Sequence, residues 1–143
     1  MIDMTKKQFY ILNLTWGLIM NIIGFIVALC LLIAGQRPKK SGLVWCFEIG
    51  EGWGGVNLGL VILVCKDSDA DTKIHEFGHA IQNAKYGLAM PFIVCIPSAV
   101  RYWIREFQYR SGNPPKTDYD AIWFEKEATE LGKEYVAKWN LTI

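Results

Sequence analysis

The sequence predicts an α+β fold, in which one N-terminal transmembrane helix precedes a small domain with a short β-hairpin or sheet and two long helices. Three observations support this prediction. Residues 8–34 contain no charged side chain, residues 43–65 hold two apolar stretches separated by glycines, and helical patterns fill the second half of the chain. A chain of 143 residues suits one domain with an appendage. We therefore expect a membrane anchor at residues 1–36 and a domain at residues 37–143.

The composition indicates contact with membrane lipid and argues against a nucleic-acid partner. Hydrophobic residues make up 52% of the chain, which is high for a soluble domain of this size. The net charge is only +1 at pH 7, so the chain has no overall basic character with which to bind nucleic acid. The 4 cysteines form no CxxC pair and lie in apolar runs, where cysteine usually acts as a small buried side chain.

Residues 8–34 are long enough for one tilted transmembrane helix, since about 20 apolar residues span the hydrocarbon core of a bilayer. A cleaved signal peptide is the alternative, but its apolar core is shorter and ends in small residues at a cleavage site. Basic residues flank the run on both sides: Lys6 and Lys7 before it, and Arg37, Lys39 and Lys40 after it. The slight excess of positive charge after the helix favours a single pass with the domain in the cytoplasm.

Two strands are expected between the anchor and the first long helix. Residues 43–49 have the pattern of a short strand, and residues 56–65 are strongly apolar and contain β-branched side chains. A glycine-rich turn at residues 50–55 separates them. The turn is not a phosphate-binding loop, because it lacks the Gly-Lys-Ser/Thr ending. Residues 37–42 have the composition of a linker.

The following helix contains both histidines of the chain, in the run His75-Glu76-Phe77-Gly78-His79. Positions i and i+4 of a helix share one face, so both imidazoles can bind a single cation. Such HExxH helices bind Zn²⁺, which keeps an open position for water at catalytic sites, and the glutamate then suits the role of general base. The alternative is a helix with two solvent-exposed histidines that bind no metal. We expect a cap at Ser68 and a helix stop at Gly87.

A second uncharged apolar run covers residues 86–100 and is interrupted by Pro91 and Pro97. It is shorter than the roughly 20 residues that a membrane span needs. Three arrangements remain open: a re-entrant hairpin, a segment in the membrane interface, and an ordinary core segment.

Zinc needs a third protein ligand, which must come from Asp, Glu or Cys because no third histidine exists. The last helix, expected at residues 118–140, offers six acids: Asp118, Asp120, Glu125, Glu127, Glu130 and Glu134. Only Glu125 shares its helix face with a stripe of small residues, formed by Ala121, Ala128 and Gly132. Such a stripe lets another helix approach closely. We therefore predict Glu125 as the third ligand, with Glu127 as the alternative.

The pattern His75-Glu76-x-x-His79 followed by Glu125-x-x-Ala128 resembles the gluzincin metallopeptidases. Residues 55–132 also look similar to a group of uncharacterised bacterial membrane proteins. The resemblance implies a minimal zincin-like domain, bound Zn²⁺, and a peptide or protein substrate that can be membrane-associated. It further implies that the strand before the active helix, residues 56–65, pairs with an extended substrate. Gluzincins usually have Asp or Asn where this chain has Thr129, and Asp120 is the expected substitute as the carboxylate that orients a ligand histidine.

The expected function is a membrane-anchored zinc-dependent metallopeptidase. Zinc lowers the pKa of bound water towards about 7, and Glu76 takes the proton so that hydroxide attacks the peptide carbonyl. Glu76 then returns the proton to the leaving amine. A donor to the oxyanion is also needed, and Tyr119, Tyr86 and Arg101 are available.

Two other functions are compatible with parts of this sequence. A catalytically inactive zinc-binding membrane protein, acting as a scaffold or regulator, would keep the metal ligands without cleaving peptides. Peptide deformylase also has an HExxH helix, with a cysteine ligand that Cys46 or Cys65 would have to supply. The other sequence signatures of that family are missing here.

Overall fold

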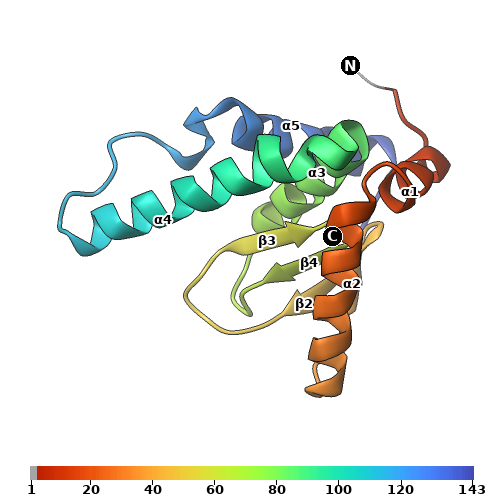
Figure 1. Ribbon diagram of the computed structural model, residues 1–143, viewed down its shortest axis with the longest axis horizontal. Helices are drawn as coiled ribbons and strands as arrows, with labels where there is room; N and C mark the ends of the chain where they lie inside the picture. Colours follow the sequence, from red (N-terminus) through yellow and green to blue (C-terminus); the bar gives the residue numbers. More distant parts are fainter. Residues whose placement is uncertain (1–2) are drawn as a thin grey trace.

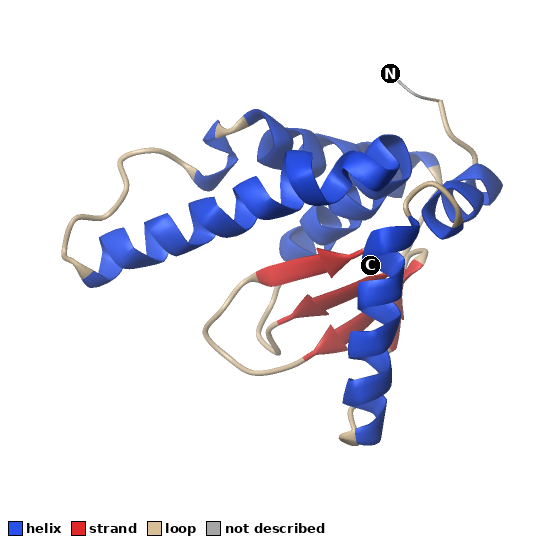
Figure 2. Cartoon of the chain, viewed as in Figure 1, coloured by secondary structure: helices blue, strands red, loops and turns tan. Residues whose placement is uncertain are grey.

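The structure, a computed structural model, describes residues 3–143 and confirms the α+β class. Its five α-helices are α1 (Lys6–Leu14), α2 (Leu18–Ile33), α3 (Ala70–Tyr86), α4 (Ile96–Arg110) and α5 (Trp123–Lys138). The four strands are β1 (Lys39–Ser41), β2 (Val44–Glu48), β3 (Gly55–Leu58) and β4 (Val61–Val64). Three short helical segments, η1 (Gly87–Ala89), η2 (Pro91–Cys95) and η3 (Tyr119–Ala121), complete the described chain (Figures 1 and 2).

The strands form one mixed sheet in the order β1-β2-β4-β3, with β2 and β4 parallel and the other pairs antiparallel. Helices cover both faces of this sheet (Figure 1). Val61 and Leu63 of β4 pack in a cluster with residues of α2, whereas Ile62 and Val64 pack in a cluster with residues of α3. Because both faces of β4 are covered, all four of its residues are buried.

The sheet has two more strands than the sequence predicted. Residues 56–65, expected as one strand, contain most of β3 and all of β4, joined by a tight turn at Gly59 with φ +74°. A side chain at Gly59 would meet the Asn21 side-chain oxygen at 2.5 Å, so the close approach of α2 also requires glycine there. Residues 37–42, expected as a linker, contain β1, which pairs with β2.

The single helix expected over residues 8–34 is wrong, because α1 and α2 meet at an angle of 84°. A buried polar joint holds this bend. Asn21 Nδ2 donates to the Asn13 carbonyl at 2.8 Å, and Asn83 Nδ2 of α3 donates to Asn13 Oδ1 at 2.7 Å. Both amides also donate to the Gly17 carbonyl, at 3.0 Å each. These bonds satisfy backbone groups that a continuous helix would bond internally.

Helix α1 belongs to the main core of the domain. Phe9 is fully buried, with its ring 5.8 Å from the rings of both Phe77 and Trp139. The Tyr10 hydroxyl donates to the Leu43 carbonyl at 2.9 Å. The first part of the expected anchor therefore packs against α3 and the C-terminal residues.

Among the helices of residues 3–143, none is by itself long and apolar enough to cross a membrane. Two helix pairs reach the required length and composition only together: α1 with α2, and residues 70–89 with residues 91–110. The second pair is bent by 115°.

The apolar run at residues 86–100 is helical almost throughout and is divided between the end of α3, η1, η2 and α4. Both of its prolines stand in the first turn of a helical segment, where the missing N–H costs little. Met90 and Val94 are buried in a cluster with residues of α2 and α5, whereas Phe92 and Ile96 are exposed. The run is thus core on one side and surface on the other.

Helices α3 and α5 pack closely at two glycines. A Cβ at Gly78 would lie 1.8 Å from the Ala128 carbonyl oxygen, and one at Gly132 would lie 2.1 Å from the Ile74 carbonyl oxygen. The predicted close approach along the small-residue stripe is therefore confirmed. The last helix begins later than expected, at Trp123, because η3 and the extended residue Ile122 precede it.

Candidate metal centre

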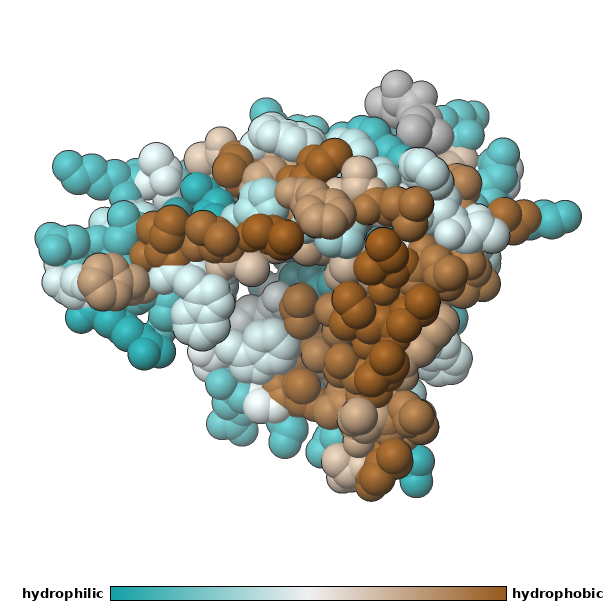
Figure 3. Space-filling model, in the orientation of Figure 1, coloured by the Kyte–Doolittle hydropathy of each residue, from teal (hydrophilic) through white to brown (hydrophobic). Residues whose placement is uncertain are grey.

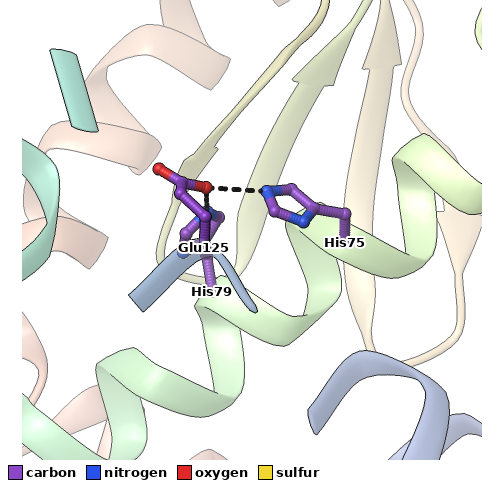
Figure 4. A group of neighbouring side chains, drawn as sticks. All are labelled: His75, His79 and Glu125. Atoms are coloured by element: carbon purple, nitrogen blue, oxygen red, sulfur yellow. Dashed lines mark hydrogen bonds and ion pairs between the residues drawn. The ribbon is translucent and has the colours of Figure 1, made fainter. Parts of the chain in front are cut away.

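The side chains of His75, His79 and Glu125 meet where α3 and α5 cross (Figure 4). One ligand atom from each lies within 4.8 Å of the others. Glu125 Oε2 is 3.1 Å from His75 Nε2 and 3.3 Å from His79 Nε2. The structure thus brings together the three residues that the sequence suggested as metal ligands.

Helix α3 presents the two histidines one above the other. Its N-cap is Asp69, whose carboxylate accepts from the Thr72 backbone N–H at 2.8 Å, so the expected cap at Ser68 is wrong by one residue. The helix then runs without interruption to Tyr86. The rings of His75 and His79 lie one turn apart, with centroids separated by 4.7 Å.

A hydrogen-bond chain fixes the tautomer of His79. Gln82 Nε2 donates to the Phe124 carbonyl at 2.8 Å and to Glu127 Oε2 at 2.9 Å. Since both amide hydrogens of Gln82 are used, its Oε1 is the atom that faces His79 Nδ1 at 2.7 Å. Oε1 only accepts, so Nδ1 of His79 carries the proton. Nε2 of a neutral His79 then directs its lone pair at Glu125.

A second chain of hydrogen bonds fixes the tautomer of His75. The Thr129 hydroxyl donates to Asp120 Oδ2 at 3.0 Å and lies 2.9 Å from His75 Nδ1. A hydroxyl has one hydrogen, so Thr129 accepts from His75, whose Nε2 is left with its lone pair. The carboxylate of Asp120 therefore reaches His75 through Thr129.

When both imidazoles are neutral, three acceptor atoms without a proton between them therefore face one another. A cation is what such a cluster requires, since lone pairs on two imidazoles and a carboxylate repel at these distances. Two imidazole nitrogens and one carboxylate oxygen are a known ligand set of catalytic zinc. Without a metal, protons take this place: burial lowers the pKa of His79, but attraction to Glu125 and Glu76 raises it above its ordinary value.

Glu125 is completely buried, and both of its oxygens have partners. The Ser98 hydroxyl of α4 donates to Glu125 Oε1 at 2.5 Å, and the Tyr119 hydroxyl lies 3.4 Å from the same oxygen. Burial alone would raise the pKa of Glu125, but hydrogen bonds from His75 and His79, when their Nε2 atoms are protonated, hold it far below its ordinary value. Glu125 is therefore ionised at neutral pH, with Oε2 directed at the histidines.

Glu76 lies beside the cluster, between α3 and β3. A Cβ at Gly55 would lie 2.7 Å from Glu76 Oε1, so only glycine lets β3 run so close. The other oxygen, Oε2, is buried and has no hydrogen-bond partner among residues 3–143. Burial raises the pKa of Glu76, with His79 and His75 opposing the shift. A buried carboxylate with one free oxygen is suited to accept a proton from a water molecule at this position.

The remaining sequence candidates lie outside the cluster. Glu127 accepts from the Tyr86 hydroxyl at 2.7 Å and pairs with Lys85, so it supports Gln82 and does not point at the histidines. Arg101 donates to the backbone carbonyls of Asp118 and Tyr119, at 2.8 Å and 3.0 Å. Tyr119 is thus the suggested oxyanion donor that comes nearest to the cluster. Within residues 3–143, the cluster contains neither Cys46 nor Cys65.

Sequence reasoning assigned no role to Ser98 or Gln82. Ser98 is the one hydroxyl-bearing residue within residues 87–100. A single polar side chain in an apolar run is the feature by which the sequence could have indicated a role for it. Gln82 lies three residues after His79, a spacing at which helical side chains meet.

Comparisons with protein-family models, with curated proteins and with solved structures found no match for this chain. Its function is therefore inferred from the chemistry of the residues around His75, His79 and Glu125.

Proposed function

We propose that the chain is a membrane-associated zinc metallopeptidase of the gluzincin type. His75, His79 and Glu125 would hold Zn²⁺, and Glu76 would act as general base. One observation carries this proposal: three ligand atoms converge beside a buried carboxylate whose second oxygen has no partner among the described residues.

The ligand set fits zinc better than harder cations. Mg²⁺ and Ca²⁺ prefer shells made of oxygen, whereas two of the three atoms here are imidazole nitrogens. Each ligand is also held by a partner outside the cluster: Thr129 on His75, Gln82 on His79 and Ser98 on Glu125. Ligands fixed in this way bind without first having to be ordered.

Bound zinc supplies Lewis-acid chemistry, since it lowers the pKa of water to about 7 and polarises a carbonyl group. Glu76 would accept a proton from water through Oε2, which has no partner among the described residues, and pass it to the leaving amine. Burial of Glu76 helps it to hold the proton between these two events. The Tyr119 hydroxyl, near Ser98 and Glu125, is the proposed donor to the oxyanion.

Strand β3 is the proposed binding site for the substrate backbone. It stands at the edge of the sheet, whereas β4 is paired on both sides by β2 and β3. An extended peptide can therefore add only to β3 at this end of the sheet. Gly55 of β3 lies against Glu76, which places the edge strand next to the proposed base.

The apolar α2 is the proposed membrane contact of the N-terminal part. Residues 18–33 contain no charged side chain, and many of their large apolar side chains are exposed. The basic residues that follow α2 favour the cytoplasmic side for the domain.

The decisive experiment compares the Glu76→Gln variant with the unchanged chain. Both are expected to retain zinc, measured by elemental analysis of the purified protein, and only the unchanged chain is expected to cleave a peptide library followed by mass spectrometry. Equal cleavage by both would refute the role of Glu76. An inactive zinc-binding scaffold would hold zinc in both forms and cleave in neither.

A further inference from the structure

Helix α4 carries an apolar stripe that nothing in the described chain covers. None of its residues is buried. The stripe continues from η2 along one side of the helix at a spacing of three or four residues, and its members are between 53% and 72% exposed: Phe92, Ile96, Val100, Trp103 and Phe107. Monomeric soluble proteins rarely expose so continuous an apolar strip.

The opposite side of α4 holds the helix against the metal centre. Ser98 donates to Glu125 Oε1, and Arg105 Nη1 donates to the Thr117 carbonyl at 2.7 Å. Arg101 is bound to the carbonyl groups of Asp118 and Tyr119 in the same way. The polar side of α4 is thus fixed to the segment that leads into α5, and the apolar stripe necessarily faces outward.

Helix α2 has a second exposed apolar side. Its inner side packs on the sheet, where Gly24 lies against the Leu58 carbonyl and Val27 and Leu31 join the cluster around Phe47. Its outer side is exposed and wholly apolar, with Leu18, Ile22, Phe25, Ile26, Leu29 and Ile33. Figure 3 shows the hydrophobic residues gathered over α2 and along α4 on one face of the molecule, with the surface hollowed between them.

We propose that the outer sides of α2 and α4 together form one membrane-binding surface, and that the peptidase acts on peptide segments held at the bilayer surface. The substrate class rests on the proposed peptidase function. The membrane-binding surface does not depend on the peptidase function.

The charge pattern favours a lipid bilayer over a second protein copy as the occupant. Charged side chains are absent from α2 and from the first turn of α4, whereas basic residues follow α2 and stand in the last turn of α4. Arg101 and Arg105 are bound on the polar side of α4, but Arg110 stands in its last turn and Lys116 follows it, against the single acid Glu106 of residues 101–116. Aromatic and basic residues at one end of an apolar helix are typical of the headgroup region, where anionic lipids attract positive charge.

The contact between Ser98 and Glu125 places the proposed metal site close to the bilayer, which indicates the substrate class. Since α4 touches lipid on one side and Glu125 on the other, only about one helix diameter, roughly 10–12 Å, separates the proposed metal site from the bilayer. A peptide anchored in the membrane can span this distance and reach the site while its anchor remains in the lipid. A free peptide must first find it by diffusion, at a lower effective concentration.

Flotation of the full-length protein with vesicles of equal parts phosphatidylcholine and phosphatidylglycerol tests the surface without reference to activity. The double variant Trp103→Ser, Phe107→Ser is expected to lower vesicle partitioning about tenfold. A second double variant on the same stripe, Phe92→Ser, Ile96→Ser, should do the same. Trp123→Ser, which removes a tryptophan from α5 that is 54% exposed against 65% for Trp103, should leave partitioning unchanged.

Two results would overturn the membrane surface. One is wild-type partitioning by both stripe variants. The other is a lipid-free dimer of the unchanged chain that dissociates in these variants, because the occupant would then be a second copy. Sedimentation of the same samples measures their oligomeric state.

Cleavage of one peptide sequence, with and without an acyl chain that holds it on the vesicles, tests the substrate class. The acylated form is expected to be cleaved at least about tenfold faster, and the stripe variants should lose this preference while still cleaving the free peptide. Equal rates for both forms would refute the substrate class. Cleavage of neither form would refute the peptidase function and the substrate class with it, whereas the flotation decides the membrane surface independently.

Discussion

Gly78 of α3 lies directly under the backbone of Ala128 in α5, so that a Cβ on residue 78 would be only 1.8 Å from the Ala128 carbonyl oxygen. This contact fixes the distance between the helix that carries both histidines and the helix that carries Glu125. Because backbone cannot move aside as a flexible side chain can, the helix pair must separate to admit even one methyl group.

The Gly78→Ala variant is therefore expected to lose stability, at the upper end of the roughly 1–3 kcal/mol that overpacking costs, despite the better helix propensity of alanine. It should also bind zinc more weakly, because Glu125 moves away from the histidines. Thermal unfolding and zinc competition with a chelating dye measure the two effects. Gly54→Ala is the matched control, since a Cβ there meets no atom within 4 Å and the backbone has no positive φ. Equal stability of the two variants would contradict the close packing.

Asn21 is expected to stabilise the bend between α1 and α2. This buried side chain accepts from the Leu60 N–H at 2.8 Å and donates to the Asn13 carbonyl, so it connects both N-terminal helices to the sheet. Asn21→Leu keeps the size and leaves these backbone groups without partners, at a cost on the order of 1–3 kcal/mol for each group that remains unsatisfied. Chemical unfolding measures the loss. A variant as stable as the unchanged chain would show that the bend does not depend on this joint.

Thr129 is expected to act through its hydroxyl alone. Thr129→Val has nearly the same shape but cannot accept from His75 or donate to Asp120, and a loss of such a partner typically weakens metal binding about 10–100-fold. Thr129→Ser retains the hydroxyl and should restore most of the affinity. Zinc affinity by dye competition distinguishes the three proteins. Equal affinity of the valine and serine variants would mean that packing, and not the hydrogen-bond chain, is what matters.

The zinc-free protein should show a defined pH dependence of stability. The folded-state pKa of His79 is raised, so its contribution is complete below pH 6.5, its ordinary value, and is lost as the pH rises through the raised value. The pKa of Glu125 is lowered, so its contribution is complete above pH 4.5 and is lost as the pH falls. The pair therefore contributes most between pH 4.5 and 6.5.

Thermal unfolding of the zinc-free chain over a pH series measures this dependence. The decline above pH 6.5 should disappear when zinc is added, since zinc then replaces the proton between His79 and Glu125. Stability of the zinc-free chain that continues to rise above pH 6.5 would contradict the assignment of the proton to this pair.

The parts of the site that sequence could predict are those set by local geometry. His75, Glu76 and His79 follow from helical spacing, and Glu125 follows from the small residues on its helix face, which do pack against α3. The bend between α1 and α2 could not be predicted in the same way. It depends on hydrogen bonds between residues far apart in the sequence, such as Asn13 and Asn83, whereas the composition of the run fits a straight helix.

The division of residues 56–65 into two strands could not be predicted from local composition either. Residues 56–65 have the composition of one strand, whereas the structure turns at Gly59, where β3 folds back on β4 and α2 approaches closely. Ser98 was missed because its partner, Glu125, comes from another helix and hydroxyl groups carry no periodic signal.

Glu125 and Glu127 point in different directions from α5, so substituting each one tests which of them binds zinc. Only Glu125 faces the histidines, while Glu127 supports Gln82 from outside the cluster. Glu125→Gln keeps the shape of this buried side chain and removes the charge that balances the cation. It should lower zinc affinity by more than the roughly 10–100-fold that is typical for the loss of a supporting partner.

Glu127→Gln is the matched control. An amide oxygen at residue 127 can still accept from Gln82, so His79 keeps its tautomer and the zinc content should be close to that of the unchanged chain. Elemental analysis after dialysis against a weak chelator compares the two variants under identical conditions. Loss of zinc from Glu127→Gln together with full retention in Glu125→Gln would exchange the two roles, and would mean that α5 turns by about half a helical turn when the metal binds.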